Sequence, residues 1–253
     1  MSRVTTLPAE TRGAAAASHS RLAVASAIGT AQILAWGSSY YLLAVLAGPI
    51  TADTGWPLTW IMGALSIGML ASAFTLAAVI MTVISVHLLA LLQSQGLALA
   101  AAVALGTLIG PSQVGARVLE MLFGRQAHPI WSLVASSFLV AVGLGMLVGA
   151  PGVAAAGIVM YGMGSGIRSI ARGTVPLALF GNAGYAVLMG RIAMPTLIAQ
   201  AASPFLGAWL LDRFGAHITL AVLCAASVLN ILMVLALLPA VRNSAWEEQR
   251  SVT

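Results

Sequence analysis

Residues 57–92 are the feature of this sequence that most limits how the chain can fold. This stretch of 36 residues contains no Arg, Lys, Asp or Glu, and His87 is its one ionisable side chain. A single α-helix of this length extends about 54 Å, whereas a bilayer's hydrocarbon core is about 30 Å thick and needs roughly 20 residues to cross. The stretch is therefore too long for one ordinary membrane span and nearly long enough for two.

The composition of the whole chain indicates a membrane protein. Hydrophobic residues make up 60% of the chain and charged residues 7%, and the mean hydropathy is +1.01. So few charged side chains cannot cover that much apolar surface in water. Backbone groups in lipid must bond to one another, which permits helices or a closed barrel. Uninterrupted apolar runs, instead of alternating ten-residue segments, predict an all-α polytopic bundle of membrane helices.

The charged residues and the cysteine argue against several other functions. The net charge is +5 and all eleven basic residues are Arg. They lie between apolar runs, so the positive-inside rule explains them better than nucleic-acid binding does. Cys224 is the one cysteine, which excludes a disulfide within the chain. The sequence shows no nucleophile with a base, metal cluster or phosphate loop, so we expect no enzyme activity, catalytic residue, metal or cofactor.

The apolar runs predict the order of spans. Residues 1–21 are read as a disordered cytoplasmic lead and residues 243–253 as a polar cytoplasmic tail. Residues 173–190 are Gly-rich and contain Pro176, which predicts a loop with an interfacial piece. The predicted spans are residues 22–47, 97–116, 131–148, 153–167, 192–211 and 218–238, together with one or two spans in residues 57–92.

The distribution of Arg favours two spans in residues 57–92. A hairpin gives eight spans with both termini in the cytoplasm, and then Arg213 alone of the eleven Arg residues lies outside. A single helix gives seven spans and moves the three N-terminal Arg residues outside, so the positive-inside rule prefers the hairpin. Residues 71–74 are the predicted turn, within a break between Gly68 and Thr75. No Gly, Pro or charge marks residues 71–74 as a turn, so the alternative of one long helix stays open.

Several segments resemble bacterial transporters of the major facilitator superfamily. Residues 22–73 resemble helices 1 and 2 of that family, through the segments GTAQILAWGSSYYL (29–42), GW (55–56) and WIMGALSIG (60–68). Residues 74–242 resemble helices 7 to 12, through VHLLALLQ (86–93), GPSQV (110–114), RGTVPLALFG (172–181) and residues 190–207. The resemblance implies a secondary transporter of a small solute in the cell inner membrane. Family members have twelve spans and carry a Gly-x-x-x-Asp-Arg-x-Gly-Arg-Arg signature in the loop between helices 2 and 3, whereas this signature and the equivalents of helices 3 to 6 are absent here.

Polar side chains inside the spans are the candidate solute contacts, because such groups are costly in lipid and often line a transport path. Gln32, Trp36 and Tyr40 are spaced four apart and share one helical face, where they either line a cavity or pack and anchor at an interface. The full candidate set is Gln32, Trp36, Tyr40, His87, Gln113, Tyr161 and Gln200.

His87, Arg117 and Glu120 each have a structural alternative. His87 either titrates or binds a ligand during transport, or bonds a neighbouring helix, and the second is the favoured reading. Arg117 and Glu120 are three residues apart and predict a local ion pair, with a gate as the second reading. The pairs Gly106/Gly110, Gly145/Gly149 and Gly162/Gly166 form Gly-x-x-x-Gly patterns, which predict close helix packing.

Two functions remain open on the sequence alone. The first is transport of an unidentified small solute, by the chain alone or as a homo-oligomer, impaired by the loss of four helices. The second is a non-transporting membrane remnant or interaction partner, because alternating access needs two matched halves. The partners expected are the lipid bilayer and a small molecule, and no nucleic acid.

Overall fold

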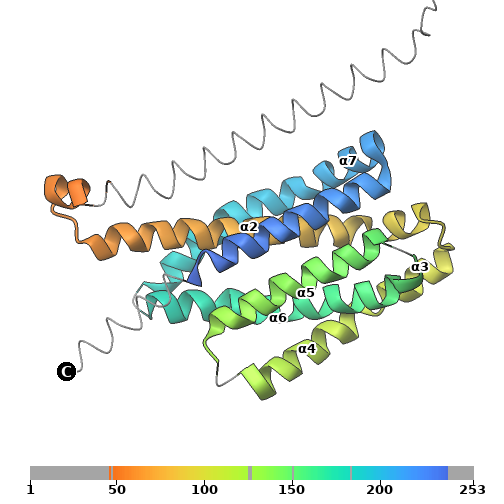
Figure 1. Cartoon of the computed structure of the whole chain (residues 1–253), viewed down its shortest axis with the longest axis horizontal. Helices are drawn as coiled ribbons and strands as arrows, with labels where there is room; N and C mark the ends of the chain where they lie inside the picture. Colours follow the sequence, from red (N-terminus) through yellow and green to blue (C-terminus); the bar gives the residue numbers. More distant parts are fainter. Residues whose placement is uncertain (1–45, 47, 125–126, 150, 183, 239–253) are drawn as a thin grey trace, which may run out of the picture. The chain divides into compact units, whose positions relative to one another are not determined.

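The computed structural model describes residues 46, 48–124, 127–149, 151–182 and 184–238. Within these residues the regular structure is helical and no strand occurs, which confirms the predicted all-α class. The predicted lead (1–21), most of the first span (22–47) and the polar tail (243–253) lie outside the described residues. The elements are α2 (Leu58–Ser94), α3 (Leu99–Gly106), α4 (Ile109–Phe123), α5 (Pro129–Gly149), the 3₁₀ turn η2 (Pro151–Val153), α6 (Ala154–Phe180) and α7 (Tyr185–Leu235) (Figure 1).

The chain divides into two compact units, Met1–Gly63 and Ala64–Thr253. In the first unit, residues 48–54 are helical and end at Gly55, whose N–H donates to Thr51 O at 3.0 Å. The φ of Gly55 is +69°, in the left-handed region that glycine enters without a Cβ clash. The packing and the cavities described below belong to the second unit.

Residues 58–94 fold as one helix, so the predicted hairpin at residues 71–74 was wrong. Helix α2 is continuous for 37 residues, through the expected break between Gly68 and Thr75. Ser72 Oγ donates to Gly68 O at 2.8 Å, as a helical serine does one turn back. A turn here would leave backbone groups unpaired in an apolar setting, whereas a continuous helix pairs them internally, and that cost outweighs the preference set by the Arg distribution.

Helix α7 reverses direction at Gly215, which matches the predicted boundary between residues 192–211 and 218–238. Gly215 has φ 77° and ψ 173°, so the 51-residue element consists of two helices joined at this residue. The first part follows α2 in the same direction, because Thr75 bonds Thr196 and His87 bonds Pro204. The second part runs back, because Asn230 bonds Ala73. Figure 1 shows the two parts side by side, in lighter and darker blue.

Residues 173–190 are mostly helical, so the predicted loop was also wrong. Helix α6 continues through Pro176 to Phe180, and α7 begins at Tyr185. Proline costs a helix one backbone hydrogen bond, but Pro176 is buried and its packing against neighbouring helices offsets that loss. Tyr185 OH donates to Gly173 O at 2.9 Å across the connection, so the two helices are joined by a short turn.

Helix α6 lies against α4 and α5, and its glycines allow the close approach (Figure 1). A Cβ on Gly162 would lie 2.8 Å from Ser112 Cβ, and one on Gly166 would lie 2.5 Å from Gln113 O. These distances confirm the predicted close packing at Gly162/Gly166. In contrast, Gly110 and Gly149 have no atom within 4 Å of a Cβ position, so those patterns do not mark tight contacts.

Buried apolar side chains form two clusters that join α2 to the other helices. The larger contains Ile84 and Leu88 of α2, Leu144 of α5, Ile158 of α6 and Leu220 of α7. The smaller joins the earlier half of α2 to the other ends of α5, α6 and α7, through residues that include Leu70, Leu133, Val175 and Val234. The second unit is thus held together along the whole of its α2 segment.

Four segments of the described chain are long and apolar enough to cross a membrane: Gly63–Ser94, Leu99–Phe123, Pro129–Gly149 and Tyr185–Leu235. The second combines α3 with α4 and extends seven residues past the predicted end of that span at Ala116. The length of Tyr185–Leu235 reflects its two parts around Gly215. Helix α6 has 27 residues but is not one of the four.

Candidate solute-binding cavity

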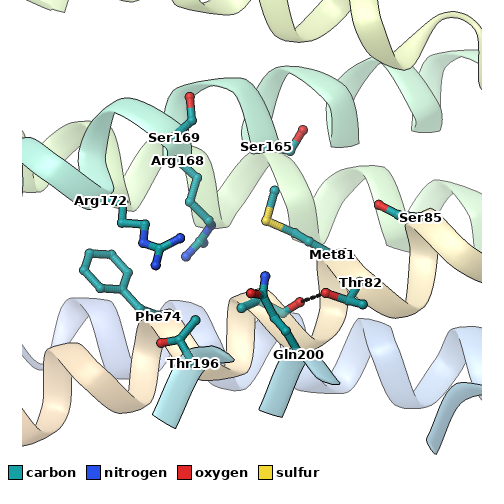
Figure 2. A pocket seen from close by; sticks show the side chains of 11 residues that line it. Phe74, Met81, Thr82, Ser85, Ser165, Arg168, Ser169, Arg172, Thr196 and Gln200 are labelled. Atoms are coloured by element: carbon teal, nitrogen blue, oxygen red, sulfur yellow. Dashed lines mark hydrogen bonds between the residues drawn. The ribbon is translucent and has the colours of Figure 1, made fainter. Parts of the chain in front are cut away.

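A cavity of about 320 Å³ lies between α2, α6 and α7 (Figure 2). The α2 residues that line it run from Phe74 to Ser85, in the middle of the apolar segment Gly63–Ser94. A mainly apolar cavity with a few polar groups, placed between helices, is a preferred location for a small-molecule site. The lining residues are Phe74, Ala78, Met81, Thr82 and Ser85 of α2, Ser165, Arg168, Ser169 and Arg172 of α6, and Thr196 and Gln200 of α7.

Arg168 is the centre of a hydrogen-bonded group that joins four helices. Its Nη2 donates to Ser137 Oγ of α5 at 2.9 Å and to Asn230 Oδ1 of α7 at 3.0 Å. Asn230 Nδ2 donates in turn to Ala73 O of α2 at 2.7 Å. All three side chains are buried, with Arg168 6%, Ser137 1% and Asn230 2% exposed. The sequence reading placed Arg168 in a cytoplasmic connection, and the structure places it in the interior of α6.

The two side-chain partners of Arg168 both bond its Nη2, and neither carries a negative charge. Nε and Nη1 are buried and have no hydrogen-bond partner in the described part of the chain. Ser137 and Asn230 are neutral, so neither offsets the positive charge. An uncompensated cation away from water is costly, and a buried group without its partners is a recurring mark of a functional site.

Arg172 adds a second guanidinium to the same cavity. It lies four residues after Arg168, so the two side chains project from the same face of α6. Figure 2 shows both guanidinium groups extending toward the space between α6, α2 and α7. The described lining residues include these two cations and no Asp or Glu. The cavity is therefore positively charged.

Four of the five hydroxyl groups in the lining, those of Thr82, Ser165, Ser169 and Thr196, donate their protons to their own helices. Thr82 donates to Ala78 O, Ser165 to Gly162 O and Thr196 to Ile192 O, at 2.8, 2.8 and 3.0 Å. A hydroxyl has one proton, so in this arrangement these groups can only accept a further hydrogen bond. The partly exposed N–H donors of the lining come from Arg172 and the Gln200 amide, while Arg168 Nε and Nη1 are unpartnered but buried behind the cavity surface.

Three of the predicted solute contacts lie at or next to this cavity. Gln200 lines it directly. Gln113 Nε2 donates to Ser165 Oγ at 2.9 Å, and Tyr161 OH donates to Met81 O at 3.3 Å. Gln113 and Tyr161 thus contact residues of the lining and hold α4 and α6 to their neighbours. Gln32, Trp36 and Tyr40 lie outside the described residues.

His87 bonds the neighbouring helix, which agrees with the favoured reading of the sequence. Its Nε2 lies 3.0 Å from Pro204 O of α7. A carbonyl oxygen only accepts, so Nε2 carries the proton in this bond. A Cβ on Gly207 would lie 2.6 Å from His87 Cδ2, so the ring fills the space that this glycine leaves. His87 is not one of the residues that line the 320 Å³ cavity.

Arg117 and Glu120 belong to a second cavity, of about 530 Å³, between α4, α5 and α6. The Glu120 carboxylate accepts a hydrogen bond from Ser132 of α5, which also lines this cavity. No ion pair joins Arg117 to Glu120 among the described residues, so the predicted local pair is replaced by a contact between helices. The gate reading stays a prediction.

Sequence reasoning missed Arg168, Arg172, Ser137 and Asn230 as a group. Asn230 was the available signal, because a single amide inside the apolar run 218–238 is costly in lipid unless it has a partner. Arg168 was assigned to a connection because Pro176 and the nearby glycines indicated a loop. Once α6 continues to Phe180, the spacing of Arg168 and Arg172 places both on one face of that helix.

These features define an all-helical protein with apolar helices suited to a membrane and a basic cavity between three of its helices. Comparisons with models of protein families, with curated proteins and with solved structures found no match to this chain. The class of the protein therefore follows from its own sequence and structure.

Proposed function

We propose that the chain is a secondary transporter of the major facilitator type that binds a small solute in the cavity between α2, α6 and α7. The observation that carries this proposal is the position of the cavity, whose α2 residues Phe74–Ser85 lie in the middle of an apolar helix. Alternating access needs a solute site near the bilayer centre, between elements that can move against each other. The family resemblance of residues 22–242 adds to the proposal.

The proposed location is the inner membrane, and the continuous α2 changes the proposed topology. One helix in residues 58–94 gives seven spans, of which residues 22–47 are the first. The C-terminal tail then lies in the cytoplasm, as the Arg distribution favours, and residues 1–21 lie on the opposite side. The eight-span count with both termini in the cytoplasm depended on the hairpin.

Counterflow in proteoliposomes tests the transport proposal. The purified full chain is reconstituted, loaded with each member of a panel of carboxylates, sugars, amines and neutral solutes, and assayed for exchange with labelled solute. We expect saturable exchange of at least one solute, with a KM raised by Gln200→Ala, because Gln200 lines the cavity. Gln93→Ala removes the same amide at an exposed position near the end of α2 and serves as the matched control. Absence of saturable exchange across the panel would favour the remnant or interaction partner.

A further inference from the structure

We infer that the cavity between α2, α6 and α7 selects a small organic carboxylate, bound through Arg168 and Arg172. This inference rests on the proposed function, because it assigns a substrate class to the same cavity. It starts from the charge of the lining, which contains two Arg residues and no acidic residue among those described. A carboxylate would supply the missing counter-charge in an environment where water does so poorly.

The free atoms of Arg168 identify the kind of group that the cavity accepts. Ser137 and Asn230 hold Nη2, while Nε and Nη1 stay unpaired although Arg168 is only 6% exposed. Both atoms are buried, so a carboxylate at Arg168 displaces the side chains that cover them before its oxygens accept from Nε and Nη1, whereas Arg172 is partly exposed and lines the cavity directly. Because Ser137 and Asn230 fix the side chain in advance, binding orders little of the protein, which favours affinity.

The opposite wall of the cavity indicates that the anion carries an apolar body. Phe74, Ala78 and Met81 of α2 line the cavity together with the two Arg residues (Figure 2). An inorganic ion would leave this apolar surface without a partner, whereas a short aliphatic or aromatic acid would cover it. The volume of about 320 Å³ lies at the lower end of small-molecule sites, which suits a compound of this size.

Arg172 provides the variant that tests the site without breaking the helix contacts. Arg168 joins α5, α6 and α7, so its substitution alters folding as well as charge. Arg172 is partly buried, lines the same cavity and is not among the partners of the Ser137–Asn230 group. Arg172→Gln therefore removes one cavity charge and keeps that group, and Arg172→Lys retains the charge. Arg191→Gln removes a charge from an exposed position of α7 outside the cavity and is the matched control.

The experiment measures thermal unfolding of the purified full chain in a neutral detergent, followed by reaction of Cys224 with a thiol-reactive dye. The probes are benzoate and lactate, with choline and glycerol as the cationic and neutral comparisons. We expect benzoate or lactate to raise the midpoint temperature by at least about 2 °C in the unmodified protein and in Arg191→Gln. Arg172→Gln should bind the same acid at least about tenfold more weakly, and Arg172→Lys should fall between them.

A lipid headgroup offers the same anionic chemistry as a free acid, so a second arm separates the two sources. The titration is repeated in phosphatidylcholine vesicles with and without phosphatidylglycerol. Stabilisation by the free carboxylate in phosphatidylcholine alone supports the solute site. Stabilisation that needs phosphatidylglycerol and does not respond to free acid would overturn it, as would equal binding by Arg172→Gln or a response to choline.

The outcomes also separate this inference from the transport proposal. Saturable exchange of a neutral or cationic solute, with an unchanged KM in Arg172→Gln, would overturn the carboxylate assignment and leave transport standing. Carboxylate binding that depends on Arg172, without exchange of any solute, would overturn transport and leave the anion site standing.

Discussion

Arg168 of α6 and Asn230 of α7 are joined by a 3.0 Å hydrogen bond between two side chains that are almost fully buried. Asn230 also donates to Ala73 O, so one amide connects α2, α6 and α7. An amide is suited to this position because its oxygen accepts from the guanidinium while its nitrogen donates to a backbone carbonyl.

Replacing Asn230 with Ala should lower the free energy of unfolding by about 2 kcal/mol, because Arg168 Nη2 and Ala73 O both lose a partner. Unfolding in mixed detergent, followed by fluorescence, measures the change. Ser227→Ala is the matched control, since in the part of the chain that the structure describes Ser227 bonds only the carbonyl of Cys224 in its own helix. A loss no larger than that of the control would show that the bonds of Asn230 contribute little.

Gly166→Ala should destabilise the protein by about 1 to 3 kcal/mol, because its Cβ would lie 2.5 Å from Gln113 O in the backbone of α4. Gly115→Ala in α4 has open space around its Cβ position and should be neutral or stabilising by about 0.5 to 1 kcal/mol. The same unfolding assay compares the two variants. Similar effects of both substitutions would contradict the close contact between α4 and α6.

The continuity of α2 predicts the separation between its two ends. Nitroxide labels at Ala64→Cys and Val86→Cys, both exposed, lie 22 residues apart, or about 33 Å along one helix. A hairpin at residues 71–74 would bring the two positions to about 12 Å. Double electron–electron resonance in a Cys224→Ala background measures the distance, and singly labelled samples control for contacts between copies. A dominant short distance would restore the hairpin.

The sequence was sufficient to predict an all-helical protein and the boundary between the two parts of α7. It was not sufficient for residues 57–92, where the predicted break does not occur. The charge-free stretch 57–92 and the low charge content predicted apolar helices, and the boundary predicted between spans 192–211 and 218–238 contains the reversal at Gly215. Both predictions depend on local properties, namely hydropathy and the conformational freedom of glycine. The Gly162/Gly166 pattern was also informative, because small residues matter wherever two backbones approach.

The remaining features depend on contacts between residues that are far apart in the sequence. Pro176 indicates the end of a helix when read locally, and only its burial between helices explains why α6 continues. Arg168 appeared to belong at a membrane surface because its partners lie 31 and 62 residues away. The distribution of Arg likewise favoured a hairpin, but the positive-inside rule takes no account of the backbone hydrogen bonds that such a turn would break.

The sequence separation between Arg168 and its hydrogen-bond partners also affects the order in which these contacts can form during synthesis of the chain. During synthesis Ser137 precedes Arg168, whereas Asn230 follows it by 62 residues. Helix α6 carries two cations and is not among the segments that hydropathy alone assigns to the membrane. We therefore expect the position of α6 among its neighbours to depend both on α5, which is made before it, and on the second part of α7, which is made after it. A chain that ends before Asn230 would leave Arg168 Nη2 with Ser137 as its one remaining side-chain partner in the described part of the chain.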